Sequence, residues 1–160
     1  MREGLYKKFA DRGFKVGAEI GVYTGANARN MFSIIPGLKL YLVDPWNQKK
    51  RHNPLRAYRM VRRLAAKYDA VIMRKKSEQA APLVQDGSLD FVYIDGDHSY
   101  DFAMLDIILW SRKVREGGIV SGHDYYKRGK FGVRHAVDDY VRYHGLNLIL
   151  SAGRNWHWEK

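Results

Sequence analysis

The chain has 160 residues, no cysteine, and 28 Lys and Arg against 17 Asp and Glu, which gives a formal net charge of +11. This length predicts a single domain over residues 1–160, and an apolar fraction of 46% supports a core, which excludes a disordered tail protein. The missing cysteine excludes disulfides, thiolate metal sites and Cys nucleophiles. No apolar run reaches the length of a membrane span or a signal peptide, so we expect a cytoplasmic protein with no membrane partner.

Short apolar runs alternate along the chain with segments whose apolar residues recur at helical spacing. In chain order we expect a helix at 5–9, a strand at 16–20, a glycine turn at 21–25, a helix at 28–35, a strand at 38–43, a helix at 54–68, a strand at 70–73, a short helix from 77, a strand at 89–94, a helix from 100, a strand at 119–121, a helix at 133–141, and strands at 146–150 and 155–159. Ser77 is expected to cap the short helix, and Gly117 with Gly118 to close the helix from residue 100.

Strands that alternate with helices predict βαβ units, and therefore an α/β fold with a parallel sheet and helices on both faces. The last two strands break the pattern, because residues 151–154 alone separate them and a parallel crossover needs a dozen residues or more. We therefore expect them to form an antiparallel hairpin at the end of a mostly parallel sheet.

Most of the excess charge lies in residues 45–68, which contain no acid. Asn53 and Pro54 predict the start of a helix there, with one apolar face beginning at Leu55 and one basic face. The basic residues of this segment are Lys49, Lys50, Arg51, Arg56, Arg59, Arg62, Arg63 and Lys67, and a smaller cluster contains Lys127, Arg128, Lys130 and Arg134. These surfaces favour an anionic partner such as nucleic acid, nucleotide or anionic lipid, although a solvated basic face also accounts for them.

The glycine turn follows a strand and opens a helix, which is typical of a nucleotide-binding loop. Asp44 ends the next strand, 23 residues after Gly21, where a carboxylate can accept both hydrogen bonds of a ribose diol. The spacing lacks the three glycines of a dinucleotide fingerprint, and Glu19 would repel a pyrophosphate. The turn therefore favours a ligand that carries an amino group or a sulfonium.

The stretch from Glu19 to Asn27 resembles the first motif of class I S-adenosylmethionine-dependent methyltransferases, in the branch of the catechol and macrolide-sugar O-methyltransferases. The resemblance implies a Rossmann-like, doubly wound, mostly parallel seven-stranded sheet with an antiparallel C-terminal hairpin strand. It also implies that the chain binds S-adenosylmethionine. The methionine part would be bound by Glu19 at the amino group and by Gly21, Tyr23, Gly25 and Asn27 at the carboxylate end, with Asp95 near the methyl group. The nucleoside would be bound by Asp44 at the ribose, by Pro45 or Trp46 against the adenine, and by Ser77 and Glu78 at the adenine edge.

The segment Asp95-Gly-Asp-His98 resembles the metal and base motif of the same branch. The resemblance implies that Asp95 and Asp124 bind a divalent cation, Mg²⁺ or Mn²⁺, and that His98 takes the proton of the acceptor hydroxyl during in-line methyl transfer. His123 departs from the pattern, since relatives carry an oxygen ligand there, and an imidazole suits Mn²⁺ or Zn²⁺ better than Mg²⁺. Asp97 is expected to act either as a metal ligand or as a helix cap.

Three functions stay open at this point. The first is O-methylation of a small acceptor, anionic or sugar-containing; the second is a nucleic-acid methyltransferase that uses the basic rim; the third is a non-catalytic module that binds S-adenosylmethionine. An NAD-linked dehydrogenase is disfavoured by the loop spacing. Few residues precede the first strand, so we expect an acceptor site that is open, takes a large substrate, or is completed by a second subunit of a homo-oligomer. Its rims are predicted at residues 45–67 and 125–132.

Overall fold

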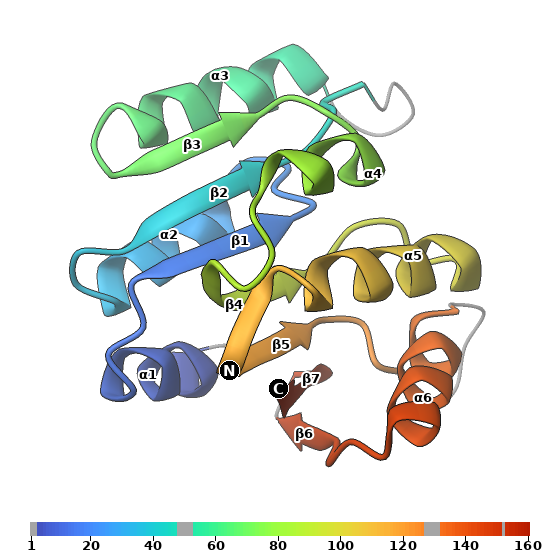
Figure 1. The fold of residues 1–160 in the computed structure, drawn as a ribbon. Helices are drawn as coiled ribbons and strands as arrows, with labels where there is room; N and C mark the ends of the chain where they lie inside the picture. The colour runs from blue at the N-terminus through green and yellow to red at the C-terminus, as the bar shows by residue number, and fades with distance from the viewer. Residues whose placement is uncertain (1–2, 48–52, 127–131, 152) are drawn as a thin grey trace.

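The computed structural model describes residues 3–47, 53–126, 132–151 and 153–160 (Figure 1). The strands are β1 (Val16–Ile20), β2 (Lys39–Val43), β3 (Ala70–Met73), β4 (Leu89–Ile94), β5 (Val114–Gly122), β6 (Ile149–Ser151) and β7 (Asn155–Glu159). The helices are α1 (Glu3–Asp11), α2 (Ala26–Ile34), α3 (Pro54–Ala65), α4 (Ser77–Ala80), the 3₁₀ turn η1 (Ala81–Leu83), α5 (Tyr100–Ser111) and α6 (Val133–His144). None of the helices in the described ranges is long and apolar enough to cross a membrane.

All seven strands join one sheet in the order β3-β2-β1-β4-β5-β7-β6. The pairs from β3 to β5 are parallel, whereas β7 runs antiparallel to both of its neighbours, β5 and β6. The predicted mostly parallel sheet and its antiparallel hairpin are therefore confirmed. The chain reverses its direction of travel across the sheet between β1 and β4, which makes the carboxyl ends of these two strands the switch point where ligands bind in such sheets.

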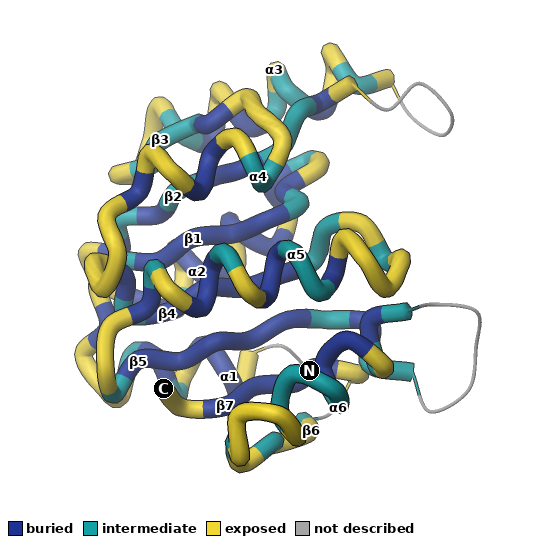
Figure 2. The backbone as a smooth tube through the Cα atoms, turned by 45° about the vertical axis from the view of Figure 1, so that its right-hand side comes forward, coloured by how far each residue is buried: buried dark blue, intermediate teal, exposed yellow. Residues whose placement is uncertain are grey.

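Helices cover both faces of the sheet, because successive strand residues point to opposite sides. On one face the buried residues of α1, α2 and α3 form one core cluster with Phe91 and Tyr93 of β4, and on the other those of α4, α5 and α6 form a second cluster with Val92 and Ile94. Figure 2 shows β1, β4 and the second half of β5 as mostly buried between these layers. Side chains on both faces of the central strands are thus removed from water, as a doubly wound fold requires.

Two details of the predicted helices are wrong. The helix from residue 100 ends at Ser111 rather than at Gly117, and β5 already begins at Val114. Gly118 lies inside this strand, where a Cβ would be 2.6 Å from the carbonyl oxygen of Asp90, so the glycines admit an irregular stretch of strand. In α3 the buried face consists of Ala57, Val61 and Leu64, and Leu55, two residues before Ala57, lies on the other side of the helix and is 53% exposed.

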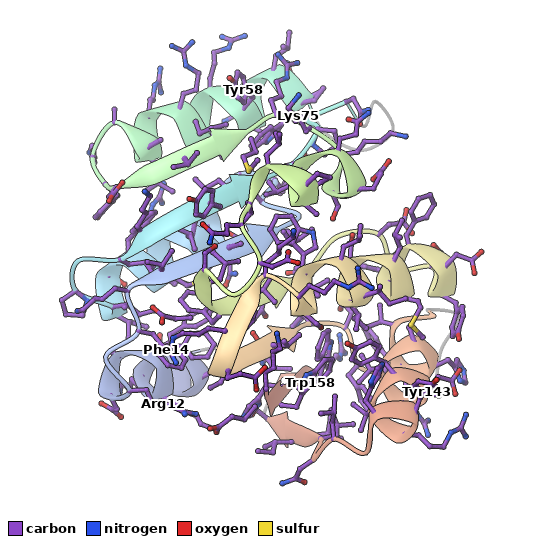
Figure 3. The ribbon with its side chains drawn as sticks, in the orientation of Figure 1. Arg12, Phe14, Tyr58, Lys75, Tyr143 and Trp158 are labelled. Carbon is purple, nitrogen blue, oxygen red and sulfur yellow. The ribbon has the colours of Figure 1, made fainter. Side chains whose placement is uncertain are left out.

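Hydrogen bonds connect α1 and the residue that follows it to the last strand, β7. Figure 3 shows Arg12 beside Phe14 below the sheet, and Arg12 forms two hydrogen bonds of 2.6 and 2.8 Å with the carboxylate of Glu159 on β7. Lys8 of α1 donates to Nε2 of His157 at 3.2 Å, so the ring must be neutral to accept it. Burial, and then the charge of Lys8, lowers the pKa of His157 to about 4.

This histidine predicts a loss of stability in mild acid. Because His157 is protonated below about pH 6.5 in the unfolded chain but only below about pH 4 in the fold, unfolding takes up a proton in that window. The free energy of unfolding should therefore fall as the pH drops from 6.5 to 4, by up to about 3 kcal/mol from this group. Urea denaturation of His157→Gln at several pH values should show a flatter dependence than the wild type. His135→Gln, which removes an exposed histidine, should keep the wild-type slope; equal slopes in all three proteins would contradict the prediction.

Candidate active site

A cavity of about 560 Å³ opens at the carboxyl ends of β1, β2 and β4, at the switch point of the sheet. Ten of the residues predicted for the site line it: Gly21, Tyr23, Asp44, Pro45, Trp46, Ser77, Glu78, Asp95, Asp97 and His98. The other described residues of the predicted set, which are Glu19, Gly25, Asn27, His123 and Asp124, are not part of this lining. The last two line a small adjoining hollow of about 10 Å³ together with Asp95 and His98.

Gly21 brings the ends of β1 and β4 together. Its φ of +87° lies in the left-handed region, and a Cβ at this position would be 2.1 Å from the carbonyl oxygen of Asp95. Its N–H donates to the carbonyl of Val43 at 2.9 Å, which ties the turn to the end of β2. Only glycine allows three strand ends to meet this closely at the cavity.

Asp44 organises the loop that follows β1 as well as its own. Its two carboxylate oxygens accept the backbone N–H groups of Tyr23 at 2.9 Å and of Trp46 at 2.7 Å. The Trp46 indole donates in turn to the carbonyl of Tyr23 at 2.8 Å, and its ring packs against Tyr58 with centroids 5.1 Å apart. Each Asp44 oxygen keeps a second lone pair, so the carboxylate can hold the loops and still accept ligand hydroxyls.

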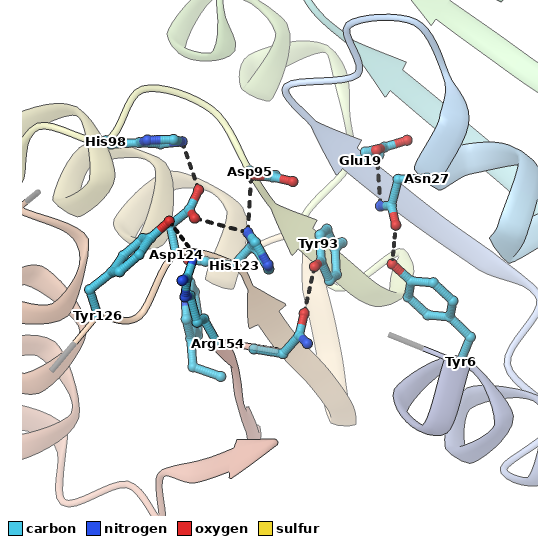
Figure 4. Close-up of polar contacts among 12 residues, drawn as sticks. Tyr6, Glu19, Asn27, Tyr93, Asp95, His98, His123, Asp124, Tyr126 and Arg154 are labelled. Carbon is cyan, nitrogen blue, oxygen red and sulfur yellow. Dashed lines mark hydrogen bonds and ion pairs between the residues drawn. The ribbon is translucent and has the colours of Figure 1, made fainter. Parts of the chain in front are cut away.

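Glu19 and Asn27 form a buried network behind the cavity wall (Figure 4). The Asn27 amide donates to the Glu19 carboxylate at 3.0 Å, and the Asn27 carbonyl accepts the hydroxyl of Tyr6 from α1. Tyr6 is fully buried, and its spacing in the sequence predicts only a place in the helix at 5–9. A sequence signal for its polar role is absent, because the hydroxyl partner lies 21 residues away on α2.

Two carboxylates and two imidazoles meet beyond β4 and β5 (Figure 4). His98 Nε2 lies 2.9 Å from one oxygen of Asp124, and His123 Nδ1 lies 3.1 Å from the other and 3.8 Å from Asp95. The potential ligand atoms of Asp95, His98 and Asp124 are within 4.8 Å of one another. The structure thus groups His98, predicted as the base, with both predicted carboxylate ligands, and His123 lies beside them. A donor set of two carboxylates and an imidazole fits a divalent cation such as Mn²⁺ or Zn²⁺.

The charges of this group stabilise one another. Burial would raise the pKa of Asp124, but hydrogen bonds from His123 and His98 outweigh it and hold the pKa well below its usual range. The hydrogen bond to Asp124 raises the pKa of His98, against the opposing effect of burial. Asp124 has a φ of 60°, a backbone conformation that is strained for a residue other than glycine. Such strain is typical of functional sites, where the surrounding structure enforces the geometry.

Two further residues at the cavity were not placed correctly from the sequence. Ser77 is the first helical residue of α4 and not its cap, which is Lys76, and its hydroxyl accepts the indole N–H of Trp110 at 2.7 Å. Asp106 on α5 lines the cavity although no prediction named it. A signal existed, because Asp106 falls at helical spacing from the buried Ala103 and Trp110. Asp97 accepts the backbone N–H of Ser99 at 2.8 Å, but Ser99 is the N-cap of α5, so Asp97 is not the helix cap and its role as a metal ligand stays a prediction.

Comparisons with known proteins agree with this geometry. Residues 18–125 match the model of a family described as a methyltransferase domain, whereas no curated protein matches significantly. Similar solved structures include an O-methyltransferase from Bacillus cereus in complex with SAH (TM-score 0.72, 12% identity, 99% of this chain and 80% of that one). Others are a putative caffeoyl-CoA O-methyltransferase from Staphylococcus aureus (0.73, 12%, 99% and 82%) and TomG from Streptomyces achromogenes with SAM (0.70, 13%, 99% and 78%). With two thirds of its length matched, the chain belongs to this methyltransferase-domain family.

Proposed function

We propose that the chain is one S-adenosylmethionine-dependent O-methyltransferase domain, and that its cavity holds the cofactor. The carrying observation is the position of Asp44, whose anchored carboxylate borders the cavity at the switch point and suits the ribose hydroxyls. Trp46 and Pro45 border one side of the adenine position, and Ser77 with Glu78 border its edge. Similar folds have been solved with SAM and with SAH bound, which supports this cofactor.

Glu19, Asn27 and Gly25 act from behind the cavity wall in this proposal. Glu19 and Asn27 fix the strand end and the first turn of α2, against which the methionine part of the cofactor lies. Gly25, with a φ of 78°, lets the chain enter α2 directly from the turn. A change at any of these three residues would act on cofactor binding through the shape of the turn.

The reaction we propose moves the methyl group from the sulfonium to an acceptor oxygen. His98 takes the hydroxyl proton; because its Nε2–H bonds to Asp124 in the neutral ring, Nδ1 is the nitrogen that accepts it. Asp95 and Asp124 hold a divalent cation, with His123 beside them, and such a cation supplies Lewis acidity to the acceptor hydroxyl. The protein otherwise aligns the oxygen, methyl and sulfur, since the sulfonium is already activated.

The acceptor we propose is a small anionic molecule. Helix α3 borders the cavity through Pro54 and Ala57, and its outer face exposes Arg56, Arg59, Arg62, Arg63 and Lys67. The positive electrostatic field of these side chains attracts anions toward the cavity mouth. The remaining basic residues of the predicted rims, Lys49, Lys50, Arg51, Lys127, Arg128 and Lys130, lie outside the described residues. Nucleic acid is the competing acceptor, and methyl transfer to it would fall steeply with salt. A second subunit that completes the acceptor site stays a prediction.

Calorimetry with S-adenosylhomocysteine tests the cofactor proposal. We expect Asp44→Ala to weaken binding about 30-fold, because two ribose hydroxyls lose a charged acceptor. An analogue without the 2′- and 3′-hydroxyls should bind the wild type and the variant equally well, which separates lost ribose contacts from general damage to the loop. Asp69→Ala, at an exposed acid before β3, is the matched control and should bind normally. Wild-type protein that does not bind S-adenosylhomocysteine would sink the proposal.

The same titration with and without Mn²⁺ or Mg²⁺ tests the cation, and release of S-adenosylhomocysteine tests the acceptor. A panel of hydroxylated acceptors, each with and without an anionic group, should give the highest turnover with the anionic members. Turnover that survives EDTA unchanged would remove the cation from the proposal. Turnover with RNA or DNA alone would replace the small acceptor by nucleic acid.

A further inference from the structure

Asp106 is a buried carboxyl group at the cavity that the proposed mechanism does not use. It lies on the inner face of α5, is 6% exposed and lines the cavity. A Cβ built on Gly96 would lie 3.0 Å from Asp106 Oδ2, so this oxygen packs directly over the turn that follows β4. A carboxylate in such a position is expensive to bury unless it finds a hydrogen-bond donor.

The charged groups that shift the pKa of Asp106 are carboxylates, and Lys76, which lines the same cavity, lies 3.8 Å from Glu78. Burial raises its pKa to about 6, a hydrogen bond with the Ser77 hydroxyl opposes the rise, and the charges of Glu78 and Asp97 add to it. The Ser77 oxygen already accepts the Trp110 indole N–H at 2.7 Å, which directs the hydroxyl proton of Ser77 away from Trp110. This corner of the cavity therefore presents carboxylate oxygens as hydrogen-bond acceptors.

Such a corner selects a ligand edge with N–H donors and little charge. A carboxylate accepts an exocyclic amino group, and its protonated form can in addition donate to the ring nitrogen beside that amino group. The amino edge of adenine has this pattern. In hypoxanthine, a carbonyl oxygen replaces the amino group and would face the acceptors of Asp106 and Glu78.

We propose that Asp106 recognises the 6-amino group of the cofactor's adenine and makes the cavity specific for adenine over hypoxanthine. The inference rests on the proposed cofactor site and assigns a specificity-determining role to a residue beyond those predicted to hold the cofactor. Ser77 positions the carboxyl group through its hydroxyl, and Trp110 positions Ser77.

Paired titrations with S-adenosylhomocysteine and S-inosylhomocysteine test the proposal. The wild type should bind the adenine compound about 100-fold more tightly. Asp106→Asn keeps the shape of the side chain and provides an amide N–H for the carbonyl of hypoxanthine, so the preference should shrink to about 5-fold or less. The ratio of the two affinities is measured within each protein, so a general loss of stability does not change it.

Asp101→Asn makes the same chemical change at an exposed position of α5 and should keep the wild-type ratio. An unchanged ratio in Asp106→Asn would overturn the proposal and leave Asp106 a structural residue, as would a wild type that binds both compounds equally well. A wild type that binds neither compound overturns the cofactor site as well as this inference, so the two failures are distinguishable.

Discussion

His98→Gln should lower kcat for methyl transfer by 10²- to 10⁴-fold, the usual contribution of a positioned general base. The glutamine side chain can still donate to Asp124, which lies 2.9 Å from Nε2 in the structure, but it cannot take up the proton of the acceptor. His98 borders the cavity beside Asp95, but the proposal gives it no contact with the cofactor. The affinity for S-adenosylhomocysteine should therefore change little. Initial rates with the acceptor found in the turnover screen, together with calorimetry, measure both quantities.

His135→Gln, on the exposed side of α6, is the control and should keep the wild-type kcat. The affinity for Mn²⁺ separates two roles of His98, because one nitrogen cannot hold a cation and accept a proton at the same time. A variant that retains Mn²⁺ affinity but loses kcat supports the base. Full turnover in His98→Gln would refute the assignment, and loss of Mn²⁺ binding would reassign His98 as a ligand.

Gly21→Ala should strongly destabilise the protein. The added Cβ would lie 2.1 Å from the Asp95 carbonyl oxygen and 2.8 Å from Cα of Gly96, both backbone atoms that a side-chain rotation cannot move. The φ of +87° adds the cost of left-handed backbone. We expect the free energy of unfolding to fall by about 3–5 kcal/mol, and binding of S-adenosylhomocysteine to be lost in whatever protein still folds.

Gly37→Ala separates the two causes, because Gly37 also has a positive φ, +67°, but nothing lies within 4 Å of its Cβ position. It should lose only about 1 kcal/mol. Urea denaturation of both variants measures the difference. If both variants lose the same free energy of unfolding, the ends of β1 and β4 can separate easily to admit the methyl group. That result would contradict the claim that the site requires their close approach.

The order of the elements and the position of the site could be predicted from the sequence, because both depend on local patterns. Apolar runs and helical spacing identify the strands and helices, and acids that follow parallel strands must meet at one edge of the sheet. Asp44 and Asp95 were found in this way, and both line the cavity.

Features that depend on distant partners could not be predicted. Tyr6 reads as an apolar helix residue until the fold brings its hydroxyl to Asn27. The irregular start of β5 is set by its pairing with β4, since the register shifts between Leu89 and Phe91. The helical spacing of Asp106 from Ala103 and Trp110 indicates burial, but its position at the cavity depends on the packing of α5 against the turn after β4. In each case the deciding neighbour is ten or more residues away along the chain.

The antiparallel strand β7 links the site to the order of synthesis. The Trp156 indole of β7 donates to the carbonyl of His123 at 2.9 Å, and the carbonyl of Arg154, in the turn before β7, accepts the N–H of Tyr125 at 3.1 Å, so the C-terminal hairpin fixes the residues on both sides of Asp124. During translation β1 to β5 emerge first, while the partners of this segment are still inside the ribosome. All residues that line the cavity lie between Ile20 and Asp106, so they are synthesised before β7, whereas the position of Asp124 depends on hydrogen bonds to a segment that is synthesised after it.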